Sequence, residues 1–370
     1  MTKFTYNVPI EPHLYVDASY YNLCYLSWKN FRKYFNYLWY DDDGDQTTTS
    51  TSTSSITTNG TDEKSQLNFS TLLYEYNQNV NGDLMYILMG ALILTFVRLF
   101  LINRISSKLV RINYVATKDM ARFSESMYNH LFYLFAFILS AMVVYQNGYL
   151  THPERIWQGY ELGEHVPTLV WAVYTMEAAH YLHCLFAVQF INSWSTDSHI
   201  LFLHHIIALM LITISYFIRT YRIGVLVLFL HDVCDIIMDG CKMLIKLRLQ
   251  NPLAIKLVDI GRNCSFLLFV AFWFTFRLYY FPIVVLYAAV IFLEHNDVQE
   301  WVPFQMELFI LLLVIFAMNV YWATLILKMV YNAICGQTID DIREIDENDS
   351  VGDTNHKVET PKMNGHSKKD

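Results

Sequence analysis

Seven stretches of this chain are apolar over a length that can cross a lipid bilayer. A helix needs roughly 20 mostly apolar residues to span the hydrocarbon core. The stretches cover residues 84–102, 129–146, 168–192, 199–218, 222–247, 264–293 and 307–330. The chain is 54% hydrophobic, which is more than the surface of a soluble domain of this size accommodates. The sequence therefore predicts an all-α fold, a polytopic membrane bundle of about seven transmembrane helices.

The sixth stretch is longer than one span needs and is interrupted by Arg277 and Pro282. Proline removes a backbone donor inside a helix. We therefore expect either a kink at Pro282 or two shorter spans.

Basic residues alternate between the two sides of the predicted bundle. Those after the first stretch are Arg104, Lys108, Arg111, Lys118 and Arg122, and those after the fifth are Lys246, Arg248, Lys256 and Arg262. The positive-inside rule places these loops in the cytosol, which puts the N-terminus in the lumen and the C-terminus in the cytosol. Arg219 and Arg222 fall on the opposite side from this assignment.

The same reasoning divides the chain into five parts. They are a lumenal N-terminal region (1–83) with a disordered Ser/Thr-rich stretch, a first transmembrane helix (84–103), a basic cytosolic loop (104–128), a catalytic bundle of about six transmembrane helices (129–335), and an acidic disordered cytosolic tail (336–370). Asn59 and Asn68 begin glycosylation sequons in the lumenal region. In the tail, Ser350 precedes Asp353 in a pattern that acidic-directed kinases favour, although a purely solvated tail fits equally well.

Charge and cysteine placement exclude other classes. The net charge is −8, much of the acid sits in the tail after Gly336, and nothing indicates a nucleic-acid partner. The six cysteines show no metal-binding spacing. We expect no resident metal.

Ionisable residues concentrate in the fourth and fifth stretches, where they are costly in lipid and usually face a cavity or a reaction. The fourth contains His204 and His205, and the fifth contains His231, Asp232, Asp235, Asp239 and Lys242. Residues four apart share one face of a helix. Only a few residues connect the two stretches, so they should form an antiparallel hairpin. The pattern predicts that histidines and carboxylates meet in a water-poor cavity that is open to the cytosol.

Such a cluster suits acyl transfer. A histidine can take a proton from an attacking amine while a carboxylate fixes its tautomer. Alternatively, a histidine can itself accept the acyl group from a thioester. A third interpretation is structural, in which these side chains hydrogen-bond among themselves and hold the helices together.

Other polar residues have weaker patterns. We assign Glu177, Asp239 and Arg277 to substrate binding, with Glu177 and Arg277 lining the cavity or pairing with each other. His180 and His183 are one turn apart, which suits either a metal site or simple packing.

From Phe202 to Lys242 the sequence resembles the longevity-assurance signature of ceramide synthases, which lies within the larger TLC domain. The motifs that carry the resemblance are His204-His205, Ser215-Tyr216, Arg222-x-Gly224 and His231-Asp232-x-x-Asp235. Further landmarks follow in family order: residues 123–127, Trp157 with Gly159 and Tyr160, Glu177, Arg277 with Phe281-Pro282, and Tyr321-Trp322. Arg219 stands where the family usually has Asn.

The resemblance implies an endoplasmic-reticulum enzyme that transfers an acyl group from acyl-CoA to sphinganine or sphingosine. It implies His204, His205, Asp232 and Asp235 as catalytic residues with His231 in support, acyl-CoA as co-substrate and no cofactor. It also implies membrane lipids as partners and a homodimer or a heterodimer with a related synthase. Two rival hypotheses stay open: a non-enzymatic TLC-domain lipid sensor or transporter, and a membrane di-iron lipid hydroxylase.

Overall fold

The computed structural model describes residues 69–160, 164–192, 197–290 and 304–335. Asn59, Asn68 and Ser350, together with the predicted disordered Ser/Thr-rich stretch and the predicted disordered tail, lie outside these residues. Within them the chain is helical apart from short connections, and the extended pairing recorded is a single bridge between Val115 and Leu247.

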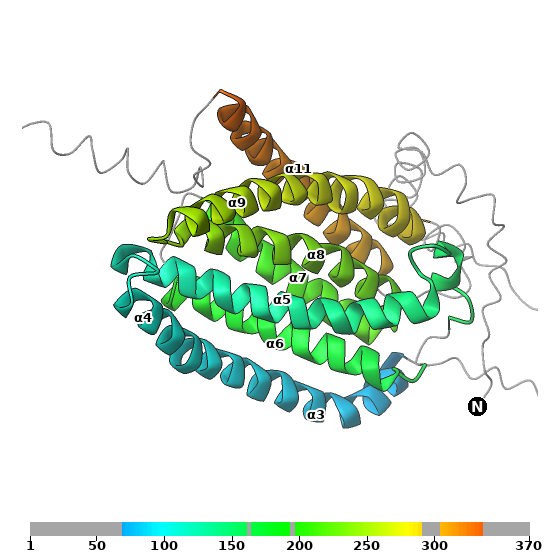
Figure 1. Cartoon of the computed structure of the whole chain (residues 1–370). Helices are drawn as coiled ribbons and strands as arrows, with labels where there is room; N and C mark the ends of the chain where they lie inside the picture. The colour runs from blue at the N-terminus through cyan, green and yellow to red at the C-terminus, as the bar shows by residue number, and fades with distance from the viewer. Residues whose placement is uncertain (1–68, 161–163, 193–196, 291–303, 336–370) are drawn as a thin grey trace, which may run out of the picture.

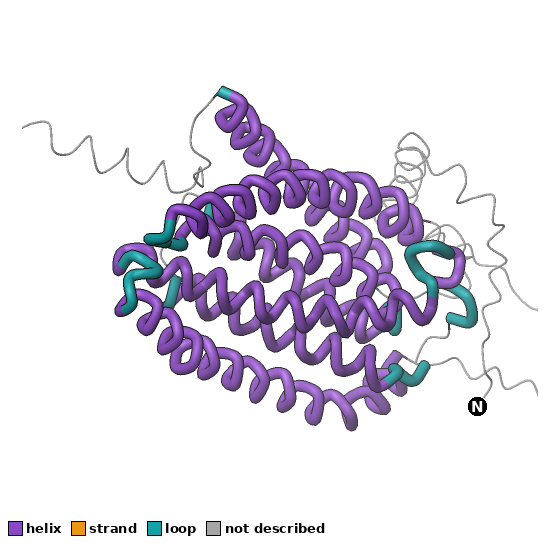
Figure 2. Tube along the Cα trace, viewed as in Figure 1, coloured by secondary structure: helices purple, strands orange, loops and turns teal. Residues whose placement is uncertain are grey.

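Long helices lie side by side in the described part of the chain (Figure 1). They are α3 (Phe69–Phe96), α5 (Met120–Asn147), α6 (Thr168–Phe190), α7 (Ser198–Phe217), α8 (Tyr221–Lys246), α9 (Pro252–Phe272) and α11 (Gln305–Ile334). Helix α3 continues through a π-helical turn, η1 (Val97–Ile102), into α4 (Asn103–Arg111), and α9 continues into the π-helical segment η4 (Trp273–Leu286). The connecting loops gather at the two ends of the bundle (Figure 2).

Five helical segments among the described residues are long and apolar enough to cross a membrane. They are Gly82–Arg111, Thr117–Asn147, Ser198–Phe217, Pro252–Val290 and Gln305–Ile334. Helices α6 and α8 are absent from this group and carry most of the intramembrane charged and histidine residues. The all-α membrane bundle is thus confirmed, whereas the count of seven spans stays a prediction.

The sixth apolar stretch forms one continuous 39-residue helix, Pro252–Val290, and not two spans. Pro282 lies inside η4. A π-helix closes i→i+5 hydrogen bonds instead of i→i+4 ones, so its wider turns accommodate a residue that lacks an N–H and crowds the preceding turn.

The segment predicted as the loop 104–128 is mostly helical. Helix α4 runs to Arg111 and α5 begins at Met120. Lys108 and Arg111 occupy the last turn of α4, where cations are favoured by the helix dipole. Helix α3 begins at Phe69, ahead of the candidate membrane span, which runs from Gly82 to Arg111.

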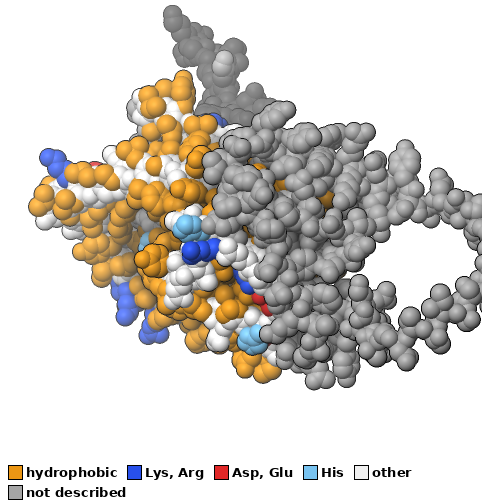
Figure 3. Space-filling model, turned by 90° about the vertical axis from the view of Figure 1, so that its right-hand side faces the viewer, with side chains coloured by type: hydrophobic (Ala, Val, Ile, Leu, Met, Phe, Trp, Pro, Cys, Tyr) orange, Lys and Arg blue, Asp and Glu red, His pale blue; other side chains and the backbone are white. Residues whose placement is uncertain are grey.

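Helix α8 lies at the centre of the bundle. It packs most extensively against α5 and also contacts α9, η4, α7 and α6. Because neighbours surround it, its polar side chains are shielded from lipid. Large apolar side chains instead cover the outside, over α3 and the outer faces of α5 and α11, and apolar atoms dominate the described part of the face in Figure 3.

Helices α7 and α8 form the predicted hairpin, joined by a short turn. Arg219 in that turn has φ 62°, in the left-handed region, which Asn adopts more readily than most residues. Its guanidinium lies over the ring of Tyr216 at 5.1 Å and donates to the Tyr216 carbonyl.

One end of the bundle carries most of the basic residues, and we call it the basic end. It is formed by the C-terminus of α4, the start of α5, the end of α6, the start of α7, and the α8–α9 connection (Figure 1). Its basic side chains are Arg104, Lys108, Arg111, Lys118, Lys246 and Arg248.

Candidate functional site

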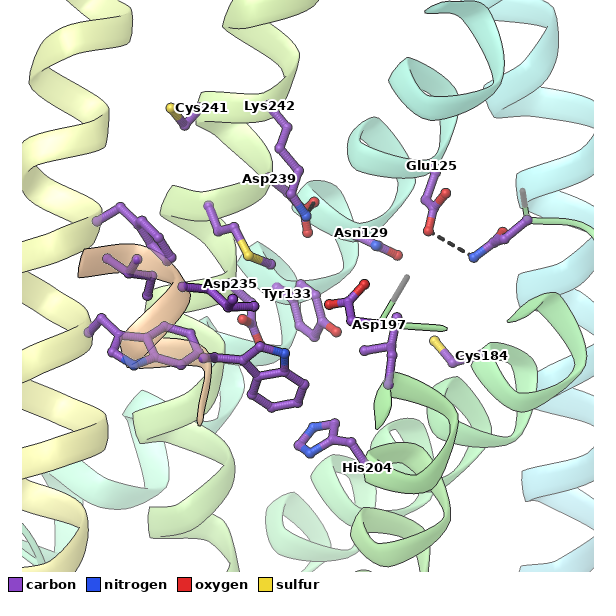
Figure 4. Close-up of a pocket in the computed structure, with 18 of the residues that line it drawn as sticks. Glu125, Asn129, Tyr133, Cys184, Asp197, His204, Asp235, Asp239, Cys241 and Lys242 are labelled. Atoms are coloured by element: carbon purple, nitrogen blue, oxygen red, sulfur yellow. Dashed lines mark hydrogen bonds and ion pairs between the residues drawn. The ribbon is translucent and has the colours of Figure 1, made fainter. Parts of the chain in front are cut away.

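A cavity of about 210 Å³ lies between α5, α6, α7, α8, α9, η4 and α11 (Figure 4). It extends to the basic end, where Glu125, Asn192, Asp197 and Lys242 border it. Its walls differ in character. Helices α5 and α8 supply mainly polar side chains, and α6 supplies Cys184, Ala187 and Val188. The aromatic and aliphatic side chains from α9, η4 and α11 are Phe266, Phe269, Trp273, Trp322, Leu325, Ile326 and Met329.

His204 and His205 project into this cavity from α7. Their ring centroids are 5.7 Å apart, and both rings flank Tyr181, at 6.4 Å and 5.7 Å. His204 also packs edge-on against Trp322. The Nδ1 atoms of both histidines are buried and have no hydrogen-bond partner.

Among the described residues, no carboxylate hydrogen-bonds the Nδ1 atom of His204 or His205 in this structure. The carboxylates of α8 have other neighbours. Asp235 binds Arg277, Asp239 binds Lys242, and Asp232 faces Glu177.

Arg277 is the centre of a hydrogen-bond network at the inner wall of the cavity. Its Nη2 donates to Asp235 Oδ1 over 2.7 Å and to the His231 carbonyl over 3.0 Å, and its Nη1 donates to Asn319 Oδ1 over 3.4 Å. The guanidinium also lies over the Trp273 ring at 4.4 Å. Arg277 thus lines the cavity as predicted, but it pairs with Asp235 and not with Glu177.

His231 is held at both ring nitrogens. Nδ1 donates to the Val227 carbonyl over 2.8 Å, and Nε2 accepts from the Asn319 amide over 3.5 Å. This arrangement fixes the tautomer and orientation of the ring. His231 borders a second, smaller pocket and not the main cavity.

Asp232 and Glu177 lie away from the main cavity. Both are almost completely buried, with 1% and 0% exposure. Their carboxyl groups are close enough to interact electrostatically between α8 and α6, but none of the four carboxyl oxygens has a hydrogen-bond partner among the described residues. The side chains of Asp232 and Asp235 differ by about 60° in direction, because they are three positions apart on a helix, and only that of Asp235 borders the cavity. The structure therefore brings His204, His205, Asp235, Asp239 and Arg277 together, and places Asp232, Glu177 and His231 outside that cavity.

Most lining residues have no place in the sequence-based prediction of the site, and four of them are polar or aromatic residues of α5 and α11. Glu125, Asn129 and Tyr133 project from α5, and Trp322 projects from α11. The spacing 125, 129, 133 puts polar groups on one face of a helix at successive turns, and that spacing was the available signal.

The second pocket, of about 40 Å³, lies beyond His204 on the side away from the basic end. Its lining is almost entirely apolar and includes Ala208, Leu211, Ile212, Ile223, Val227, Leu228, Leu308, Leu312 and Ile315. His204 borders both spaces. A ligand with a polar group and a long apolar chain could therefore place its junction at His204.

His180 and His183 have local partners. The His180 ring stacks on Phe132 at 3.7 Å, and His183 Nδ1 donates to Thr95 Oγ1 over 2.8 Å. In the parts of the chain that the structure describes, no group of three or more His, Cys, Asp or Glu side chains is arranged to hold a metal ion.

Comparison with known proteins agrees with the residue patterns. The profile of the TLC domain family (TRAM_LAG1_CLN8) matches residues 122–328. Ceramide synthase 1 of Homo sapiens is 30% identical over 79% of this chain and 84% of its own length. Ceramide synthase 4 of Mus musculus is 31% identical over 63% of this chain and 56% of its own length. Ceramide synthase hyl-1 of Caenorhabditis elegans is 28% identical over 59% of each chain.

The matched region contains all the residues that line the cavity except two. These are Arg98 in η1 and Met329 in α11. Together with the apolar helices, these matches identify a multi-pass membrane protein of the acyltransferase type. The chain belongs to the TLC domain family and, within it, to the ceramide synthases.

Proposed function

We propose that this protein is a ceramide synthase that transfers a fatty acyl group from acyl-CoA to the 2-amino group of sphinganine or sphingosine. The observation that carries the proposal is the position of His204, which borders both the polar cavity and the apolar pocket.

The two spaces fit the parts of an acyl-CoA. The acyl chain would occupy the apolar pocket, with the thioester carbonyl beside His204 and the CoA portion directed toward the basic end. The exposed Arg111 and the neighbouring Lys108 lie at that end, where they could contact CoA phosphates.

The reaction forms an amide C–N bond and breaks the thioester C–S bond. The amine must lose one proton, which a neutral histidine can accept, and the CoA thiolate must gain one, which that histidinium can return. His204 and His205 are adjacent, so one can serve as base while the other contacts the carbonyl. A route in which one histidine first accepts the acyl group uses the same pair.

Asp235 and Arg277 have a positioning role in this proposal. Their ion pair borders the cavity, so it presents a fixed dipole near the reacting atoms while keeping the local charge balanced. Asp232 and His231 would act through α8, because neither borders the main cavity.

The proposal also assigns a compartment and orientation. The basic end faces the cytosol under the positive-inside rule, so acyl-CoA would arrive from the cytosol, and the membrane is that of the endoplasmic reticulum. The N-terminal region would then be lumenal, where Asn59 and Asn68 can be glycosylated, and the tail with Ser350 would be cytosolic. A homodimer or a heterodimer with a related synthase also stays a prediction.

The test is expression in host cells that lack their own ceramide synthases. Membranes are supplied with sphinganine and a series of acyl-CoAs of different chain length, and N-acyl products are measured by mass spectrometry. N-acyl sphinganine from the wild type, and its loss in His204→Ala and His205→Ala at matched expression, supports the proposal. A folded wild type that binds sphinganine without consuming any acyl-CoA contradicts it and favours a lipid sensor.

A further inference from the structure

A second group of polar side chains lies nearer the mouth of the cavity than the histidines. Glu125 and Asn129 project from α5, and Asp239 projects from α8 across from them (Figure 4). Asn129 lies one helical turn, about 6 Å, nearer the mouth than Tyr133. Asp239 likewise lies one turn nearer the mouth than Asp235.

Asp239 has an unused acceptor directed at this space. The residue is only 1% exposed. Its Oδ1 accepts from Lys242 over 3.5 Å, but its Oδ2 is buried and has no partner. Buried polar atoms are nearly always hydrogen-bonded in native proteins, and Asp239 borders the cavity, so Oδ2 is available to a donor on a bound ligand.

Glu125 is fixed in place by a chain of contacts behind it. Its Oε1 accepts from the Asn192 amide over 2.8 Å, and the carbonyl of that amide accepts from Arg98 over 2.5 Å. Arg98 is buried, with 5% exposure, and lies over the Tyr128 ring at 5.6 Å. The Asn192 side chain thus uses both its nitrogen and its oxygen, and this series of contacts holds the Glu125 carboxylate at the cavity wall.

We propose that Asp239, Asn129 and Glu125 bind the polar head of the sphingoid base, a 2-amino-1,3-diol. This inference rests on the proposed function and names the subsite for its second substrate. The C1 hydroxyl donates to Asp239 Oδ2, the Asn129 amide contacts the hydroxyl groups, and Glu125 attracts the ammonium form of the arriving base. The amine then lies on the inner side of the head, toward His205 and Asp235.

Charge and the opposite wall both favour this ligand. The carboxylates of Asp239 and Glu125, which are close enough to interact electrostatically, attract a cationic ligand. The base is cationic before it reacts. Its alkyl chain also finds a matching surface, because Phe266, Phe269 and Ile326 form the wall across the cavity.

The experiment compares two bases on the purified full-length protein: sphinganine, and the same base without its 1-hydroxyl group. The variants are Asp239→Asn, Asn129→Ala and Glu125→Gln. The matched control is Asp259→Asn, because Asp259 pairs with Arg262 over 3.0 Å and does not border the cavity. The readout is the ratio of kcat/KM for the two bases, which a general loss of folded protein does not change.

The wild type should favour sphinganine by about tenfold, since a site built around a hydroxyl rejects the analogue that lacks it. In Asp239→Asn and Asn129→Ala the ratio should fall toward one, whereas the KM for acyl-CoA should stay unchanged. Glu125→Gln should raise the KM for both bases about equally. Asp259→Asn should match the wild type.

Two results separate failure of this inference from failure of the proposed function. Active variants that keep the wild-type ratio overturn the head-group site and leave the acyltransferase intact. A wild type that makes no N-acyl product from either base overturns both. If a variant is too slow for kinetics, binding of radiolabelled sphinganine without acyl-CoA replaces the ratio, and unchanged affinity in Asp239→Asn overturns the site.

Discussion

The guanidinium of Arg277 donates to the carboxylate of Asp235 over 2.7 Å, and the two side chains are only 3% and 17% exposed. This ion pair connects the π-helical segment η4 to the central helix α8 at the wall of the cavity. It therefore combines a structural role with a position beside the proposed reacting atoms.

Replacing only one residue of this ion pair should destabilise the folded protein. Arg277→Met leaves the Asp235 carboxylate buried without a partner, which should lower the free energy of unfolding by about 3–5 kcal/mol. The double variant Arg277→Met with Asp235→Leu should regain most of that loss but should remain inactive. Thermal unfolding in detergent measures the first effect, and N-acylation measures the second.

The control for this prediction is Arg262→Met. Arg262 pairs with Asp259 within one helix, and both side chains are more exposed, so the change should be within about 0.5 kcal/mol. Equal effects of Arg262→Met and Arg277→Met would contradict the assignment of a buried, stabilising pair.

The adjacent histidines should matter for activity and little for stability. His204→Ala and His205→Ala should each lower kcat by about 10²- to 10⁴-fold, the usual contribution of general acid–base catalysis. Neither substitution removes a hydrogen bond at Nδ1, because the Nδ1 atoms of both histidines lack partners. His183→Ala, a buried histidine outside the cavity, should keep kcat near the wild-type value. Loss of kcat in all three would indicate a structural role for the histidines.

The apolar pocket beyond His204 should select the acyl chain. Filling it with Ile315→Phe should shift preference toward shorter acyl-CoAs, whereas Leu312→Ala should favour longer ones. Each methylene that gains or loses burial corresponds to about 0.8 kcal/mol, or about fourfold in kcat/KM. Competition among acyl-CoAs of graded length, followed by mass spectrometry of the products, measures the shift. Ile310→Phe, at an exposed position of the same helix, should leave the product distribution unchanged.

Gly224 allows α8 to approach Tyr174 on α6. A Cβ at this position would overlap the Tyr174 hydroxyl, which hydrogen-bonds Ser215 over 3.0 Å. Gly224→Ala should therefore destabilise the protein by about 1–3 kcal/mol, and adding Tyr174→Phe should recover part of the loss, because the next ring atom lies 3.0 Å away.

Gly82→Ala is the matched control for that substitution. Nothing lies within 4 Å of its added Cβ, and alanine is the better helix former, so unfolding temperature should stay equal or rise. If Gly224→Ala behaves like Gly82→Ala, the close contact with Tyr174 does not limit packing.

Much of the fold and part of the site could be predicted from the sequence. Apolar length identified the helices, and four-residue spacing placed Asp235 and Asp239 on one face of α8. The short turn at Arg219 correctly implied the α7–α8 hairpin. These features depend on local geometry, which the order of residues determines directly.

Contacts between distant helices could not be predicted in the same way. Helix α8 packs mainly against α5 and not against its hairpin partner α7. Glu125 and Asn129 of α5 therefore line the cavity, although they precede the cavity residues of α8 by about a hundred positions in the sequence. Spacing defines the faces of a helix, but it does not say which neighbour each face meets. For that reason the partner of Arg277 and the separation of Asp232 from Asp235 became clear only from the structure.

The central position of α8 also bears on how the protein is made. This helix and α6 fall outside the group that is apolar enough to cross a membrane by itself, and each Asp or Lys at the middle of a span opposes translocon insertion by about 2.5–3.5 kcal/mol. Helix α8 carries three aspartates and Lys242 within a few turns. It can therefore reside in the bilayer only once α5, α9 and their neighbours enclose it, so biogenesis and assembly of the site become a single event. If the site failed to assemble, the polar side chains of α8 would contact lipid, and the protein would become a target of membrane quality control.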